Sequence, residues 1–226
     1  MLANTLVLNF HGIGDPAVPQ APGEDRYFVT EDIYRRTIRA LAKQEADSHA
    51  KICITFDDGN LSDLTVGLPA LAEAGRSALF FVLAGRIGQK GYLSGQDIRE
   101  LVAAGMSIGN HGWDHVDWTQ LDEAGRQREL YDARMRIADE AGVPIDEAAI
   151  PFGHLDRALL GHLKDADYSR VNTSSRGLAM DGAWFRPRCS VTSDFDPDRD
   201  IAQQFKQRKL VRGTLSAPLR RLRFGI

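Results

Sequence analysis

Short apolar runs alternate along this chain with longer segments in which apolar residues recur every three or four positions. The short runs are typical of buried strands, and the periodic segments are typical of amphipathic helices. Seven strands are predicted, at 5–10, 51–56, 78–84, 106–110, 148–151, 168–172 and 184–191. Because helical segments separate the strands, the sheet should be mainly parallel and the fold class α/β. We expect a single distorted (β/α)7 TIM-like barrel in preference to an open sheet.

Local signals indicate where the helices begin and end. Helices are expected at 30–46, 61–74, 94–105, 120–141 and 155–166. Thr30 stands at the N-cap position of the first helix, and Ser94 with Asp97 has the spacing of a capping box. Gly75 is expected to end the second helix.

The length of 226 residues and the hydrophobic content of 43% suit one domain with a substantial core. We expect a barrel over residues 1–200 and a basic helix or tail over 201–226, a segment with seven Lys/Arg and no Asp/Glu. This tail is either a solvated terminus or a peripheral contact with anionic lipid. Its basic residues are Lys206, Arg208, Lys209, Arg212, Arg220, Arg221 and Arg223.

The opening stretch "MLANTLVLNFHG" has no basic region, and Asn9 and His11 end its apolar run. No later segment of the sequence is long and apolar enough to cross a bilayer. On this basis we expect a cytoplasmic location. No nucleic-acid partner is expected.

Polar residues stand at the ends of several predicted strands. His11 follows the first strand, Asp57 and Asp58 follow the second, and His111 follows the fourth. In (β/α) barrels the chemistry sits at the C-terminal ends of the strands. These groups are therefore expected to converge at one mouth of the barrel.

The stretches "DDGN" and "HGWDH" contain a candidate metal site. Alone, "DDGN" is also typical of a turn, whereas the i, i+4 spacing of His111 and His115 allows two imidazoles to share one metal. One carboxylate and two imidazoles form a three-ligand set that leaves a divalent metal an open position for water. The other carboxylate of the Asp pair would then be the base beside the metal-bound water.

With "TFDDG", "HGWDH" and "IPFGHLD" the chain resembles the polysaccharide deacetylase family, the NodB-homology or carbohydrate esterase family 4 group, over roughly residues 5–191. The resemblance implies metal-dependent removal of N-acetyl groups from an amino sugar or polysaccharide, with a metal-bound water as nucleophile. It implies Asp57 as base, and Asp58, His111 and His115 as ligands of one divalent ion. Zn²⁺ is the first choice for that ion, with Co²⁺ or Ni²⁺ as alternatives. The implied partner is an N-acetylated sugar or glycan.

Substrate contacts are expected from two places. Pro151, Phe152 and Gly153 form the third motif, in which Phe152 stands where the family offers a backbone N–H to the oxyanion. Trp113 and Trp118 flank the second motif, and we expect Trp113 to stack on a sugar ring. Packing at the barrel rim is the alternative for both indoles.

The chain departs from the family pattern at the arginine that often precedes the third motif, because Ala149 fills that position. Arg186 and Arg188 alternate onto one face of the last predicted strand and are candidates to replace it. The alternative is that both are ordinary surface or salt-bridge residues.

The chain also lacks the C-terminal "Leu-x-His" segment that carries the general acid in many family members. His11, in "VLNFHGIGD", is a candidate for this acid because the first and last strands of a closed barrel are neighbours. This arrangement resembles the circularly permuted members related to exopolysaccharide de-N-acetylases. Alternatively, His11 merely ends a strand, and His154 is the next candidate.

Three functions remain open at this point. The first is an N-deacetylase of an amino sugar or polysaccharide, and the second is a cytoplasmic deacylase or deformylase of a small or lipid-linked acylamide sugar. The third is a sugar-binding homologue whose catalytic machinery has decayed. The absent motif arginine favours the third, and the intact "DDG" and His pair argue against it.

Overall fold

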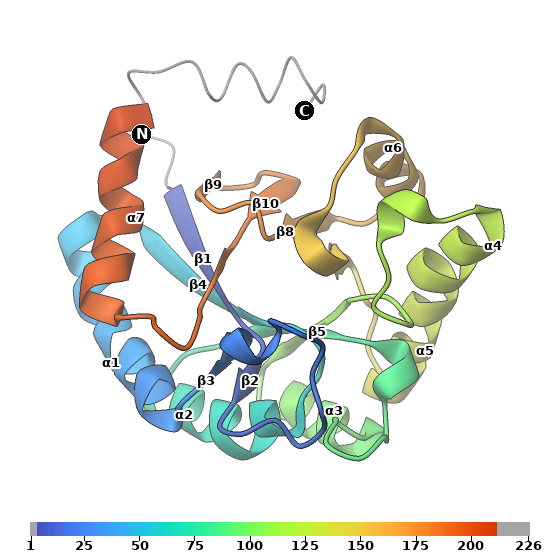
Figure 1. Ribbon diagram of the computed structural model, residues 1–226, viewed down its shortest axis with the longest axis horizontal. Coiled ribbons are helices and arrows are strands. Elements are labelled where there is room, and N and C mark those ends of the chain that lie inside the picture. The colour runs from blue at the N-terminus through green and yellow to red at the C-terminus, as the bar shows by residue number, and fades with distance from the viewer. Residues whose placement is uncertain (1–3, 212–226) are drawn as a thin grey trace.

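The computed structural model describes residues 4–211, and side chains within 5–205. A nine-stranded sheet forms the centre, and eight of its strands follow the order β10-β8-β7-β6-β5-β4-β1-β11 with every neighbouring pair parallel. The strands of this path are β1 Asn4–Phe10, β4 Lys51–Phe56, β5 Leu79–Val82, β6 Ser107–Asn110, β7 Glu147–Ala149, β8 Arg170–Thr173, β10 Phe185–Pro187 and β11 Cys189–Ser190. Helices surround the sheet (Figure 1). Because β10 and β11 are nearly contiguous in the chain but lie at opposite ends of the path, the sheet forms a nearly closed barrel, which confirms the predicted fold class.

The last predicted strand, 184–191, is two short strands rather than one. Before the break, the N–H of Arg188 donates to Thr173 O at 2.7 Å, on the β8 side. After it, the N–H of Val191 donates to Asn9 O at 2.8 Å, on the β1 side. Pro187, which has no N–H, stands next to the break. The segment therefore changes partner strands at the barrel seam, with Arg188 at the changeover.

The helices follow the predicted spans with local differences. They are α1 Glu31–Ser48, α2 Leu68–Glu73, α3 Gly95–Ala103, α4 Glu123–Arg126, α5 Ala133–Ala141 and α6 Arg157–Asp165. Thr30 caps α1 by accepting from the Ile33 N–H at 3.2 Å, and the capping box of Ser94 and Asp97 opens α3. The segments predicted as single helices at 61–74 and 120–141 each contain a π-helical stretch, Asp63–Gly67 and Gln127–Asp132. Such stretches are frequent at functional sites.

The domain boundary expected at residue 200 falls inside helix α7, Pro197–Val211. Ile201 is fully buried in the core and Phe205 packs against it, so the start of the expected tail is part of the barrel. Helix α7 lies beside α1 (Figure 1). Of the tail's basic residues, Arg212, Arg220, Arg221 and Arg223 lie outside the described residues, as do the side chains of Lys206, Arg208 and Lys209. Within residues 4–211, no helix has the length and apolar character to cross a membrane.

A column of aromatic rings supports the strands that lead into the barrel mouth. Phe10, Phe56 and Phe80 lie on adjacent strands, with ring centroids 5.5 Å apart for the first pair and 4.6 Å for the second. Tyr34 of α1 packs edge-on against Phe10 and Phe56. Phe56 faces the helices. Since successive residues of a strand point to opposite faces, the next residue, Asp57, points into the barrel.

We predict that Phe56→Ala lowers the free energy of unfolding by about 3–5 kcal/mol, because it leaves a cavity between two buried rings. Phe56→Leu, which keeps most of the volume, should cost less. Urea unfolding monitored by circular dichroism measures both. Equal and small losses in the two variants would show that the column does not support the barrel.

Candidate active site

Asp57 and Arg188 form a buried ion pair inside the barrel. The side chains are 2% and 0% exposed. Arg188 donates from Nη1 to Asp57 Oδ1 and from Nη2 to Oδ2, both at 2.7 Å. Asn9 Nδ2 donates to Oδ2 at 2.8 Å. Two-pronged bonding of this kind fixes both the position and the rotation of the carboxylate.

The strand register explains how this network assembles. Strand β1 lies between β4 and β11, and Asn9 is paired with Thr55 on one side and with Ser190 on the other. Arg188 Nη1 also donates to Asn9 Oδ1 at 2.8 Å and to Thr55 Oγ1 at 3.2 Å. Sequence reasoning did not identify Asn9 and Thr55 as site residues, although a polar residue inside each apolar strand is a visible signal.

Burial by itself raises the pKa of Asp57, but the positive charge of Arg188, followed by the field of His111 and the Arg188 hydrogen bonds, lowers that pKa well below its usual range. Asp57 is therefore an ionised carboxylate at neutral pH. Arg186 has a different position from Arg188: its closest carboxylate among the described residues is Glu147, at 4.0 Å.

Asp58, His111 and His115 converge beside Asp57. One ligand atom from each lies within 4.8 Å of the others. The His111 Nε2 and His115 Nε2 atoms are 3.7 Å and 3.6 Å from Asp58 Oδ1. Asp58 Oδ1 is buried and accepts no hydrogen bond from the described residues. The three side chains thus fit a divalent ion, which would satisfy that oxygen.

A hydrogen bond on its far side fixes the orientation of His111. The Nδ1 atom lies 2.8 Å from Ala149 O, so Nδ1 carries the proton and donates it to that carbonyl, while Nε2 keeps its lone pair toward Asp58. Burial lowers the pKa of His111 to about 4. The imidazole is therefore neutral at pH 7, which is the form that binds metals.

Glu129 organises the loop between the two histidines, and sequence reasoning missed it. This carboxylate is 2% exposed and accepts from the Trp113 and Asp114 N–H groups at 2.7 Å and 3.1 Å. The indole N–H of Trp118 is 3.4 Å away. No sequence signal distinguishes Glu129 from an exposed helical glutamate, because its partners are backbone groups of a distant loop.

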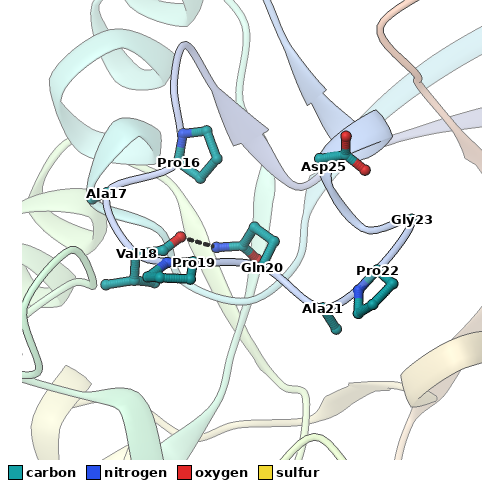
Figure 2. A pocket seen from close by; sticks show the side chains of 9 residues that line it. All are labelled: Pro16, Ala17, Val18, Pro19, Gln20, Ala21, Pro22, Gly23 and Asp25. Atoms are coloured by element: carbon teal, nitrogen blue, oxygen red, sulfur yellow. Dashed lines mark hydrogen bonds between the residues drawn. The ribbon is translucent and has the colours of Figure 1, made fainter.

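His11 lies over the same centre. Its Nε2 is 4.0 Å from Asp57 Oδ2, and its ring lies 4.7 Å from the ring of Tyr27. Tyr27 ends the proline-rich loop that begins after β2 Gly12–Ile13 and returns at β3 Phe28–Val29. Figure 2 shows this loop as an arch around an open hollow, braced by a hydrogen bond from Gln20 Nε2 to Val18 O at 2.8 Å.

The third motif places an aromatic ring at the candidate metal-ligand cluster. Phe152 is 50% exposed and its ring lies 4.6 Å from that of His115. Pro151 is buried, and Gly153 has a φ of +72° and packs against Ser174. His154 lies further out, where its Nδ1 is 2.8 Å from Asp117 Oδ2.

The side chains of Trp113 and Trp118 both pack against other parts of the protein. Trp118 is 2% exposed, so it is not available to stack on a sugar, and of the two possibilities given for this residue the burial agrees with packing. The Trp113 indole lies against Gly85 and under the guanidinium of Arg128, 4.5 Å from the ring centroid. A sugar contact for Trp113 stays a prediction.

We predict that Arg188→Gln lowers the free energy of unfolding at pH 7 by about 3–5 kcal/mol, because it leaves the buried Asp57 charge unpaired. Arg136→Gln, the control, removes an exposed guanidinium that pairs with Glu140 at 3.5 Å and should cost about 1 kcal/mol or less. The pKa of Asp57 is depressed in the folded protein, so the stabilisation is present above the ordinary aspartate pKa of about 3.9 and is lost as the pH falls through the lower folded value. Urea unfolding at several pH values should therefore show the gap between wild type and Arg188→Gln narrowing in acid. A gap that is small at pH 7 or constant with pH contradicts this account.

Comparisons with known proteins agree with this geometry. The family model for polysaccharide deacetylase matches residues 44–171, more than half of the chain. The chain is 25% identical over 139 residues to YxkH of Bacillus subtilis (strain 168), which covers 62% of this chain and 50% of that protein. It is 27% identical over 114 residues to the peptidoglycan-N-acetylglucosamine deacetylase PgdA of Listeria monocytogenes, covering 50% of this chain. The matched region spans about half of YxkH and 24% of PgdA.

Solved structures share the fold. The Streptococcus pyogenes deacetylase PplD, in complex with acetate, aligns with a TM-score of 0.74 at 20% identity over 91% of this chain and 99% of that chain. IcaB from Ammonifex degensii aligns with a TM-score of 0.72 at 22% identity, over 90% and 97% of the two chains. At these identities the likeness concerns the fold, and the family match extends over both predicted ligand motifs. The chain belongs to the polysaccharide deacetylase family.

Proposed function

We propose that this protein is a divalent-metal-dependent hydrolase that removes N-acetyl groups from an amino sugar within a polysaccharide. One observation carries the proposal: the Asp58–His111–His115 cluster lies at the barrel mouth beside an ionised, immobilised Asp57. A decayed sugar-binding protein would have no need to keep both the ligand cluster and the buried ion pair. The arrangement therefore favours an enzyme.

Asp58, His111 and His115 would hold the ion, with Zn²⁺ as the first choice and Co²⁺ or Ni²⁺ as alternatives. When bound, it would polarise the acyl carbonyl and make water a stronger nucleophile at neutral pH. Two imidazoles and one carboxylate suit such an ion, because each ring can offer a nitrogen lone pair and the carboxylate offers a negative charge. The bond from His111 Nδ1 to Ala149 O would keep that ring aligned.

Asp57 would take the proton from the attacking water. Arg188 and Asn9 hold its carboxylate, and His111 Nε2 stands 3.9 Å from Oδ2, so Asp57 lies next to the ligand cluster. The low pKa that Arg188 imposes keeps Asp57 free to accept a proton. Arg188 thus does the work that the family assigns to an arginine two residues before the third motif, where this chain has Ala149.

His11 would donate the proton that the leaving nitrogen needs, because an amide anion is a very poor leaving group. It stands 4.0 Å from Asp57 and follows β1, which lies next to β11 at the barrel seam. The exposed ring of Phe152 offers a surface for the sugar at the same mouth.

The name of PgdA describes an enzyme that acts on N-acetylglucosamine of peptidoglycan. An N-acetylated glycan is accordingly the substrate class we propose here. The test is acetate release from chitooligosaccharides and peptidoglycan by protein loaded with Zn²⁺, Co²⁺ or Ni²⁺. No release from any N-acetylated substrate, with metal bound, would exclude the deacetylase assignment.

We predict that substitutions of the two adjacent acids have different effects on metal binding and on turnover. Asp58→Ala should lose the metal, whereas Asp57→Asn should retain it and lose turnover, because only Asp58 lies among the ligands. Metal content after dialysis, measured by inductively coupled plasma mass spectrometry, and acetate release check both variants. Near-normal activity in Asp57→Asn would refute the division of roles.

His11→Gln should leave metal content intact and lower kcat by on the order of 10²–10⁴, the range expected for loss of a general acid. It should also remove the alkaline limb of the pH–rate profile, since that limb reports loss of the acid's proton. His154→Gln is the matched control, because His154 is exposed and bonded to Asp117. If His11→Gln keeps wild-type turnover and the limb, the proton comes from another group.

A further inference from the structure

Arg86 extends to the candidate metal ligands from the end of β5. It lies in the short turn Ala84–Arg86, and its Nη1 is 3.7 Å from Asp58 Oδ1. Among the described residues, Asp58 is its only carboxylate partner within ion-pair distance. The side chain is 28% exposed, so the protein covers it only in part.

Two segments of the mouth hold this arginine in place. The N–H groups of Ala84 and Gly85 donate to Gly112 O and Trp113 O at 2.9 Å and 3.1 Å, which attaches the turn to the "HGWDH" loop. The guanidinium carbon of Arg86 lies 4.9 Å from the centre of the Tyr92 ring.

Tyr92 is fixed in turn to the segment that follows Asp58. It forms an isolated β-bridge with Asn60, and the Leu93 N–H donates to Gly59 O at 2.9 Å. Contacts with both ligand motifs therefore fix the position of Arg86, and its guanidinium lies next to the candidate metal ligands.

The charges at the mouth do not balance without an anion. Arg188 neutralises the charge of Asp57, and in the proposed function Asp58 is a ligand of a divalent ion. Asp58 cannot neutralise Arg86 at the same time. Two cationic groups would then lie a few ångströms apart in a partly desolvated site, where their repulsion is costly. An anion that contacts the guanidinium removes this cost, and the planar fork of arginine matches carboxylates and phosphates.

We infer that Arg86 binds an anionic group of the substrate, so that the substrate is an N-acylated amino sugar with a carboxylate or phosphate close to the acylated nitrogen. This inference rests on the proposed function, whose substrate class it narrows. The carboxylate of a sugar acid and the phosphate of a sugar phosphate or lipid-linked sugar share the required chemistry.

Binding of deacetylated product analogues to Zn²⁺-loaded protein tests the inference without turnover. Isothermal titration calorimetry would compare glucosamine, glucosamine 1-phosphate and muramic acid, since the last two carry their anionic group on a carbon next to the one that bears nitrogen. We expect wild type to bind at least one of the two sugars with an anionic group about tenfold or more tighter than glucosamine, and Arg86→Gln to lose that preference. Which of these two sugars is preferred identifies phosphate or carboxylate as the group.

The matched control is Arg136→Gln, which removes an exposed arginine that pairs only with Glu140 among the described residues, at 3.5 Å. It should keep the wild-type preference. Arg86→Gln should also retain its metal, since the change removes a cation that competes for Asp58. Equal binding of the sugars with and without an anionic group by wild type, or loss of metal in Arg86→Gln, would overturn the inference and leave Arg86 as a partner of Asp58 alone.

Turnover separates this inference from the proposed function. Acetate release from N-acetylglucosamine, its 1-phosphate and N-acetylmuramic acid should show Arg86→Gln raising KM for the preferred charged substrate and not for the neutral one. An equal loss of kcat on all three would assign Arg86 to the reaction's own oxyanion and overturn the inference. If wild type releases no acetate from any substrate, the proposed function fails, while the binding comparison still decides the role of Arg86.

Discussion

A carboxylate buried in a protein interior stays charged only when a countercharge and hydrogen bonds replace the water it has lost. In this barrel Arg188 and Asn9 provide both for Asp57, and the arrangement depends on three strands that meet at the seam. Because the last strand is interrupted at Arg188, the guanidinium of this residue reaches the neighbouring strands. The geometry of the site thus depends on how the barrel closes.

The charge state of the acidic residues follows from this pairing. Asp57 is held ionised by Arg188, and Asp58 faces two imidazoles and Arg86. A third carboxyl, Asp63, is fully buried in the π-helical stretch nearby, and burial together with the charges of Asp58 and Asp57 raises its pKa well above the ordinary value. Two ionised acids therefore lie near a third carboxyl that holds its proton more tightly than an ordinary aspartic acid does. Positive φ angles at Asp58, His115 and Phe152 add strain on the order of 1–3 kcal/mol each, which is typical of functional sites.

The sequence was sufficient for the architecture and for most of the cluster. Apolar periodicity located the barrel strands, and the rule that chemistry sits at their C-terminal ends brought His11, Asp57 and His111 to one mouth. The sequence alone did not decide which of Arg186 and Arg188 reaches the site. The two residues alternate on the last predicted strand, and the break in that strand depends on how the barrel closes. Glu129 was equally hidden, since its partners are backbone N–H groups of a distant loop. The roles that we propose for the two adjacent acids come from the motif resemblance, since spacing alone left them open.

We propose that Arg188 keeps Asp57 outside the coordination shell of the bound ion, so that the two adjacent acids have different roles. Anomalous X-ray diffraction at the zinc edge, from crystals grown with Zn²⁺, tests it most directly. The account predicts one peak within about 2.0–2.2 Å of Asp58, His111 Nε2 and His115 Nε2, with Asp57 still paired to Arg188. A peak bonded to Asp57, or one at a different place on the protein, would contradict it.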